Sequence, residues 1–364
     1  WYDPPGGLTQ VKVEIAGGVG PDVMMQGAGI YSMLDVLMPL TGMMERMASR
    51  YPHLRDVFPA VLDQFTWQGE VYALPYGGNA HALIYNEHLF DSVGLPYPDP
   101  EWTWDDALAI ARRLTQDVTG DGVPDVWGIN MTASGIRDAV LSFGGPVLAE
   151  DGMTVRVRNP ANERALAFFS ELMGKGLDAH PPPGTPLASN ALQQFLSGQV
   201  AIVGQGGFAV PGMRENAEFP WDAAVYPALV VEGRRYRNAY TSAEGWAVLR
   251  STVHPGEVER FLEFLLAPER LTEMGAAGIV IPPYRGAPLN AFLSSPPPPK
   301  NLAAFTDALQ FGQRLYMLSP VGSQWQTQVA EMVGRVFSFR ETPASALEQI
   351  ERLMIATVRE FYSR

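Results

Sequence analysis

The chain has 364 residues, which is too long for one ordinary hydrophobic core, so two lobes are expected. Its composition, 46% hydrophobic and 18% charged, is typical of a globular protein and excludes an intrinsically disordered one. A net charge of −13 argues against a nucleic-acid partner, and the absence of cysteine excludes disulfides, thiolate metal ligands and cysteine nucleophiles.

Strands and helices alternate along the first third of the chain, which predicts an α/β architecture. Short apolar runs predict strands at 11–15, 23–25 and 80–85. Asn86 is placed to cap a helix over 87–93, and Thr103 with Asp106 forms the capping box of a helix that runs to Leu114.

The remaining elements follow the same alternation. Asn159 and Pro160 open a predicted helix over 160–174, and Ser189 is expected to cap another over 190–197. Strands are predicted at 200–203 and 246–249. Further helices are expected over 255–266 and 268–276, and a long helical segment from about residue 301.

An ordered set of short motifs in residues 69–114 identifies a family. The chain resembles the carbohydrate-type extracellular solute-binding proteins of ATP-binding-cassette (ABC) importers, similar to maltose-binding protein. That family carries G-x-x-Y-x-L-P, then L-x-Y-N, then F-x-x-x-G-L and finally T-W-x-x-x-L. The matching residues are Gly69, Tyr72, Leu74, Pro75, Leu83, Tyr85, Asn86, Phe90, Gly94, Leu95, Thr103, Trp104 and Leu108.

The resemblance extends over nearly the whole chain, with one departure. Further similarity lies in 21–23, 191–208, 242–248, 319–325 and 342–347. The family has an amphipathic helix between its first strand and the P-D-V strand that follows. If 11–15 is that first strand, almost nothing separates it from Pro21, so residues are missing or the first lobe is shortened.

The resemblance implies a two-lobed fold of the periplasmic-binding type, with an interlobe ligand cleft and several hinge crossings. The crossings are expected near 80–84, 243–246 and 296–302. The implied division assigns 1–79 plus 247–300 to lobe 1, and 80–246 plus 301–364 to lobe 2. Ligand contacts made only in the closed state would drive hinge closure.

Sugars are bound by aromatic plates and short polar side chains that recognise hydroxyl groups. Phe208 stands where the resemblance places a stacking tryptophan, and Trp325 where it places a second aromatic. Taken singly, each of these rings is more often a packing residue. The ligand-binding residues expected from the resemblance and from strand ends are Gln26, Tyr76, Asn79, Phe143, Gly144, Gln205, Phe208, Thr241, Glu244 and Trp325.

An acidic turn at 117–125 offers a weak calcium candidate. Asp117, Thr119, Asp121 and Asp125 place oxygen atoms at alternate positions around glycines, as a hard cation requires. The twelfth position is Gly128, so the bidentate carboxylate of an EF-hand is absent. A solvated turn without metal is therefore the favoured interpretation, and no cofactor is expected.

The predicted function is that of a receptor outside the cytoplasmic membrane, and not of an enzyme. It would bind a sugar, oligosaccharide or polyol as a monomer and deliver it to the permease of an ABC importer. The sequence begins without methionine or signal peptide, so a leader, with or without a lipid anchor, would have been removed. One alternative is an anionic solute such as glycerol phosphate, bound by Arg137 or Arg214; another is a carbohydrate-active enzyme using Glu244.

Overall fold

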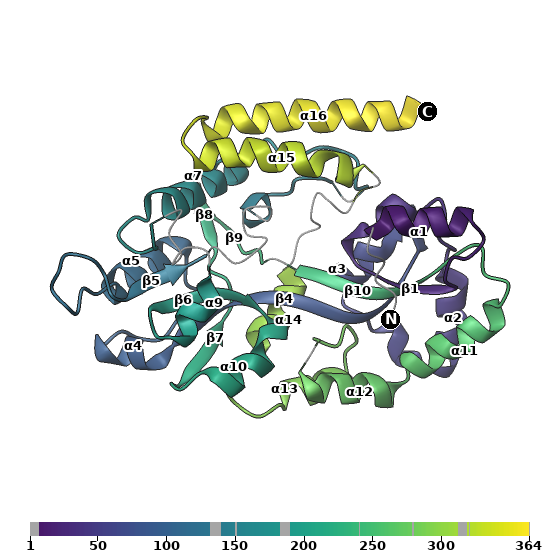
Figure 1. Cartoon of the computed structure of the whole chain (residues 1–364), viewed down its shortest axis with the longest axis horizontal. Helices are drawn as coiled ribbons and strands as arrows, with labels where there is room; N and C mark the ends of the chain where they lie inside the picture. The colour runs from purple at the N-terminus through teal and green to yellow at the C-terminus, as the bar shows by residue number, and fades with distance from the viewer. Residues whose placement is uncertain are drawn as a thin grey trace. The chain divides into compact units, whose positions relative to one another are not determined.

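The computed structural model describes residues 7–131, 140–149, 151–182, 190–239, 241–278, 280–311, 319 and 321–363 (Figure 1). The chain divides into two compact units, each assembled from three separate segments. Unit 1 consists of Trp1–Asn79, Thr241–Ser295 and Tyr316–Ser323. Unit 2 consists of Ala80–Tyr240, Pro296–Leu315 and Gln324–Arg364.

Unit 1 is built on three strands. β1 (Val23–Gln26) pairs antiparallel with β10 (Thr241–Val248), with Val23 opposite Val248 and Gln26 opposite Gly245. β10 neighbours the beginning of β4 (Leu74–Asn86). The other elements are α1 (Gly7–Ala16), η1 (Ala28–Met33), α2 (Thr41–Arg50), η2 (Pro52–Arg55), α3 (Pro59–Leu62), η3 (Asp63–Phe65), β2 (Thr66–Trp67), β3 (Glu70–Val71), α11 (Pro255–Leu265), α12 (Pro268–Ala277) and α13 (Ala287–Leu293).

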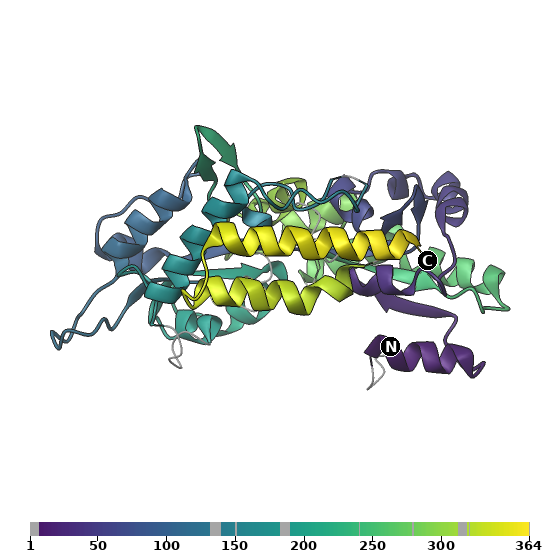
Figure 2. The same cartoon turned by 90° about the horizontal axis from the view of Figure 1, so that it is seen from above.

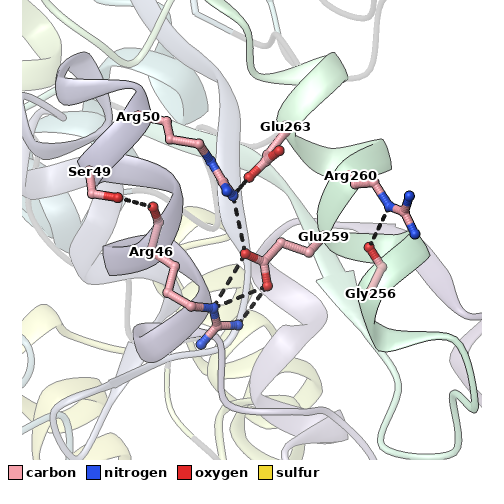
Figure 3. Close-up of polar contacts among 7 residues, drawn as sticks. All are labelled: Arg46, Ser49, Arg50, Gly256, Glu259, Arg260 and Glu263. Atoms are coloured by element: carbon pink, nitrogen blue, oxygen red, sulfur yellow. Dashed lines mark hydrogen bonds and ion pairs between the residues drawn. The ribbon is translucent and has the colours of Figure 1, made fainter.

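Four charged side chains join α2 to α11 (Figure 3). Arg46 Nη2 lies 2.6 Å from Glu259 Oε2, and Arg50 Nη2 lies 3.4 Å from Glu259 Oε1. Arg50 also forms an ion pair with Glu263. Because both pairs are spaced four residues apart, one turn of each helix presents like charges to the opposite charges of the other. The cluster thus connects two helices that lie about 210 residues apart in the sequence.

Unit 2 has a mixed sheet. The second half of β4 pairs antiparallel with both β6 (Val200–Gly206) and β7 (Trp221–Ala224), and β6 pairs parallel with β5 (Trp127–Asn130). β8 (Leu229–Val231) and β9 (Arg234–Tyr236) form a hairpin. The other elements are α4 (Glu87–Ser92), α5 (Trp104–Leu114), η4 (Val140–Phe143), α7 (Pro160–Lys175), α9 (Ala191–Leu196), η5 (Gly207–Ala209), α10 (Val210–Asn216), α14 (Ala303–Phe311), α15 (Gly322–Phe337) and α16 (Pro343–Ser363).

The last two helices lie side by side in both views (Figures 1 and 2). α16 buries a stripe that includes Ala346, Leu347, Ile350 and Met354, at the spacing expected for one face of a helix. α16 also packs against α7. These helices therefore supply much of the apolar cover of unit 2.

The local helix signals in the sequence are confirmed. The Asn86 side chain accepts a hydrogen bond from the Leu89 N–H at the start of α4. Both hydrogen bonds of the Thr103–Asp106 capping box are present at the start of α5. Asn159 caps α7 with Pro160 at its first position, as expected. The expected cap Ser189 lies outside the described residues; α9 begins after Asn190.

The strand predicted at 11–15 is wrong, because these residues belong to helix α1. A strand would place residues 11, 13 and 15 on one face. Instead Val11 is fully buried while Val13 is 60% exposed, and Val11 and Ile15 share the helical spacing of four. α1 leads directly towards β1, so the helix that the resemblance requires before the P-D-V strand is α1 itself.

The compact units change over at 79/80, 240/241 and 295/296, and the lobe limits expected from the sequence are 79/80, 246/247 and 300/301. β10 belongs to unit 1 because its last four residues pair with β1. Lys300 and Asn301 belong to unit 2 for a similar reason. Lys300 Nζ lies 2.7 Å from Glu87, and the Asn301 N–H donates to Asp222 over 2.8 Å.

Candidate functional site

A group of side chains at the edge of the unit 1 sheet centres on Tyr76. The Tyr76 hydroxyl donates a 2.5 Å hydrogen bond to Glu244 Oε2 and lies 2.6 Å from Met25 Sδ. Its ring stacks on Trp246, with centroids 5.0 Å apart and planes inclined by 29°. These four residues, from β1, β4 and β10, are called the Tyr76 group below.

Burial keeps the Tyr76 hydroxyl protonated. Tyr76 is 8% exposed, and burial, followed by the hydrogen bond and charge of Glu244, raises its pKa well above the ordinary value. The hydroxyl therefore keeps its proton and donates a hydrogen bond to Glu244, whose side chain is exposed. The result is an accessible carboxylate held in one orientation by a rigid aromatic residue.

Amide side chains lie on the same strands. Gln26, at the end of β1, is 7% exposed. Asn79 Oδ1 is likewise buried and has no partner among the described residues. Thr241, at the start of β10, is 2% exposed. Since burying an unpaired polar atom costs free energy, Asn79 is suited to a ligand that supplies the missing hydrogen bond.

A second group of side chains lies in unit 2, where β4 pairs with β6. His81 is opposite Gly206 and Ala82 is opposite Gln205, which is 8% exposed. Phe208 follows on η5 and is 57% exposed, with its ring centroid 6.3 Å from that of His81. An exposed ring held against a strand end is the kind of surface that packs on the C–H face of a sugar.

His81 is not among the binding residues that the sequence predicted. It is 6% exposed, and burial lowers its pKa to about 4, so its imidazole is neutral near pH 7. The sequence did carry a signal, because His81 is a polar residue at the beginning of an apolar run that forms the centre of β4. A buried titratable group next to an exposed aromatic marks a candidate binding position.

Phe143 and Gly144 were expected to contact ligand, and the structure instead places both in the interior of unit 2. Phe143 is 1% exposed, with ring contacts to Trp104, Phe169 and Tyr226. A Cβ atom on Gly144 would lie 2.4 Å from the side-chain oxygen of Asn162. The two residues pack the start of α7 against its neighbours, so we assign them to the core.

Trp325 was expected to be an accessible stacking plate. Its side chain is fully buried, so the ring offers no free face to a ligand in this conformation. Its indole Nε1 has no hydrogen-bond partner among the described residues. Phe208 is therefore the accessible aromatic of the two.

The acidic turn at 117–125 is closed by its own hydrogen bonds. The Asp117 carboxylate accepts from the N–H groups of Gly120, Asp121 and Gly122, and Asp125 accepts from Val118 and Thr119. The hydrogen bonds from Thr119 and Val118 lower the pKa of Asp125. In the part of the chain that the structure describes, no cluster of three or more acidic or histidine side chains is arranged to hold a metal.

The two arginines considered for an anionic solute have different outcomes. Arg137 lies outside the described residues. Arg214 Nε donates to the Pro298 carbonyl over 2.7 Å, while its Nη2 is buried without a partner in the described chain. Arg214 thus anchors the 296–301 segment to α10. Among the residues described, no helix is both long and apolar enough to cross a bilayer.

Comparison with known proteins places the chain in a family. A family model described as bacterial extracellular solute-binding protein matches residues 2–270. A binding protein of Brucella abortus (strain 2308) is 24% identical over 264 residues, which are 66% of this chain and 60% of that protein. A lactose-binding protein of Rhizobium radiobacter is 23% identical, over 60% of this chain and 52% of the relative. The chain thus spans about half to three fifths of the length of these relatives.

A solved structure extends the likeness to the fold. An ABC substrate-binding protein of Listeria monocytogenes, in complex with cycloalternan, superposes with a TM-score of 0.78 at 22% identity, over 96% of this chain and 88% of the other. The chain has the two-lobed α/β fold of the periplasmic sugar-binding proteins, as its sequence motifs predicted. Since the family model covers most of its length, the chain belongs to the bacterial extracellular solute-binding protein family.

Proposed function

We propose that this protein is an extracytoplasmic receptor that binds a sugar, oligosaccharide or polyol and delivers it to the permease of an ABC importer. The observation that carries the proposal is the Tyr76 group together with the unpaired side-chain oxygen of Asn79. Relatives with sugar ligands in their names support the same class of ligand.

The chemistry of these residues suits hydroxyl-bearing ligands. A sugar hydroxyl can donate to the Glu244 carboxylate and to Asn79 Oδ1, which both accept hydrogen bonds. In unit 2, taken by itself, the exposed ring of Phe208 can cover an apolar face of a sugar. Binding to these groups requires no bond to be broken, so we propose that the protein releases its ligand unchanged.

The wider role follows from the family. We propose that the protein acts as a monomer outside the cytoplasmic membrane, where such receptors meet their permease. A lipid anchor in a segment preceding Trp1 is part of the same proposal. The two units are proposed to be the two lobes.

Substitution of the Tyr76 hydroxyl tests the proposed site. A screen of sugars and polyols by thermal shift identifies the ligand, and calorimetry then measures its affinity for Tyr76→Phe and Glu244→Gln. Each variant should weaken binding by roughly tenfold, because a hydrogen bond to a charged group contributes about 1.5–3 kcal/mol.

A matched control uses another tyrosine that donates to a surface carboxylate. Tyr97 donates to Asp91 over 3.0 Å in unit 2, so Tyr97→Phe should leave sugar affinity unchanged. Equal affinities of wild type and Glu244→Gln for every bound sugar would contradict the assignment of Glu244. An absence of binding across the screen by a folded protein would contradict the carbohydrate class.

A further inference from the structure

Three arginines line one open depression of about 430 Å³ in unit 2, although the chain carries a net charge of −13. Arg156 and Arg158 precede α7, and Arg234 comes from β9. Tyr236 and Glu351, from β9 and α16, complete the lining that matters here. None of these residues belongs to the Tyr76 group or to the His81–Phe208 pair.

The backbone directs the three arginines to one place. The Arg156 N–H donates to the Val147 carbonyl, and Leu148 and Val155 form a β-bridge, so this segment is extended. Alternation along an extended chain puts Arg156 and Arg158 on one side, while Val157 between them is fully buried.

The same alternation operates on the hairpin. Arg234 and Tyr236 line the depression, and the Arg234 guanidinium lies 5.0 Å from the Tyr236 ring centroid. Arg235 and Arg237 point elsewhere and form ion pairs with Glu101. Arg235 and Arg237 thus share one carboxylate, while Arg234 faces the depression.

A fixed floor supports the arginines. Asn159 Nδ2 donates to the carbonyls of Pro146 and Arg156, over 3.2 and 2.9 Å, while its Oδ1 caps α7. Gly145 lies so close that a Cβ atom there would be 2.6 Å from Asn159 Oδ1. The backbone that carries Arg156 is therefore held in place before any ligand arrives.

Among the described residues that line the depression, three are arginines and one, Glu351, is acidic. Glu351 pairs with Arg158 over 3.5 Å. The charge of Arg156 helps to lower the pKa of Asp151, but the Asp151 carboxylate accepts its hydrogen bonds from Met153 and Thr154. Neither Arg156 nor Arg234 forms an ion pair with any residue that the structure describes.

We propose that this depression is an anion site that binds phosphate groups, separate from the site of the transported solute. Guanidinium groups match phosphate oxygens in geometry and charge, and can bind them through two parallel hydrogen bonds. Arg156 and Arg234 have no ion-pair partner among the described residues, and Arg158 shares its charge with Glu351. Three such guanidinium groups suit a doubly charged phosphate. The phosphate belongs either to a soluble ester or to a lipid headgroup.

Calorimetry with pyrophosphate on the full chain tests the site. The wild type should bind one pyrophosphate, more tightly at low than at high ionic strength. The double variant Arg156→Gln/Arg234→Gln should lose roughly tenfold or more in affinity, because two charge-assisted contacts are removed. The control Arg260→Gln/Arg270→Gln removes the same charge from exposed arginines of unit 1 and should bind like the wild type.

Two further measurements complete the test. Unchanged thermal unfolding of the double variant would show that it is folded. Co-sedimentation with vesicles of phosphatidylglycerol and phosphatidylcholine, but not with phosphatidylcholine alone, would assign the phosphate to a lipid. Binding of pyrophosphate without vesicle binding would assign it to a soluble ester. No saturable pyrophosphate binding, or equal losses in both double variants, would overturn the proposal.

Discussion

His180 is a buried histidine that links the stability of unit 2 to pH. It is fully buried, its Nε2 accepts from the Met131 N–H over 3.2 Å, and its Nδ1 lies 2.8 Å from the Pro181 carbonyl. One neutral tautomer satisfies both contacts, with Nδ1 as the donor. Burial lowers the pKa of His180 to about 4.

The sign of the pH dependence follows from that pKa. The unfolded chain takes up a proton on His180 near pH 6.5, while the folded protein does so only near pH 4. The free energy of unfolding should therefore fall as the pH is lowered from about 6.5 to 4, by up to about 3 kcal/mol. Denaturant unfolding across this range should show a smaller decrease for His180→Gln than for the wild type. The exposed control His88→Gln should keep the wild-type slope.

Single residues also show which parts of a site can be read from sequence. Phe143, Phe208 and Trp325 all follow predicted strand or loop ends, and all three qualified as ligand aromatics. Phe208 is exposed, whereas Phe143 and Trp325 are buried, and Phe143 contacts the rings of Trp104 and Phe169 from helices remote in sequence. Burial depends on long-range packing, which a local pattern does not contain. The unpaired oxygen of Asn79 is invisible in sequence for the same reason.

At the scale of elements, the ion-pair cluster between α2 and α11 makes a modest contribution to stability (Figure 3). Glu259 is 17% exposed and pairs with both Arg46 and Arg50, which are largely exposed. The hydrogen bond from Arg46 lowers the pKa of Glu259. Its contribution is therefore present at neutral pH and is lost as the pH falls and the carboxylate is protonated.

Neutralising Glu259 should reveal that contribution. Glu259→Gln should lower the free energy of unfolding by about 0.5–1 kcal/mol at low salt, and by less at high salt, since exposed ion pairs are screened. Among the described residues Glu257 pairs with the exposed Arg260 alone, so Glu257→Gln should change stability less. A loss that is equal for both variants would contradict the role of the cluster.

β5 and α5 approach so closely at Gly128 that no side chain fits between them. A Cβ atom on Gly128 would lie 1.8 Å from the Ala111 carbonyl oxygen of α5. Gly128 therefore serves the packing of a strand on a helix, which also explains the glycine at the twelfth position of the acidic loop that begins with Asp117. Gly128→Ala should cost about 2 kcal/mol or more in unfolding free energy. Gly212→Ala in α10, where a Cβ meets nothing within 4 Å, should be neutral or slightly stabilising.

The elements themselves were predicted best where the signal is local. Side-chain caps at Asn86, Thr103 and Asn159 define helix starts within four residues, and the structure has all three. The segment 11–15 was misread because its valines fit both a strand and a helix over so short a range. Only the burial of Val11 and the exposure of Val13 separate the two. Element type therefore needed the neighbours that those residues pack against.

At the scale of the whole molecule, the motifs of residues 69–114 predicted the family and the fold, and both are confirmed. The division into lobes at 79/80, 246/247 and 300/301 stays a prediction, while the compact units change over at 79/80, 240/241 and 295/296. The positions of the later two changes of unit depend on β10 pairing with β1 and on Lys300 meeting Glu87. Such contacts join residues more than 200 positions apart, beyond the reach of a motif.

The central claim is that this family member binds an uncharged carbohydrate or polyol through acceptor groups such as Glu244 and Asn79. Calorimetric titration of the purified chain with neutral sugars, polyols and glycerol phosphate tests it most directly. We predict saturable 1:1 binding of at least one neutral sugar or polyol, weakened by Glu244→Gln and unaffected by Arg156→Gln/Arg234→Gln. Binding of glycerol phosphate alone, or no heat from any neutral ligand with a folded protein, would contradict the claim.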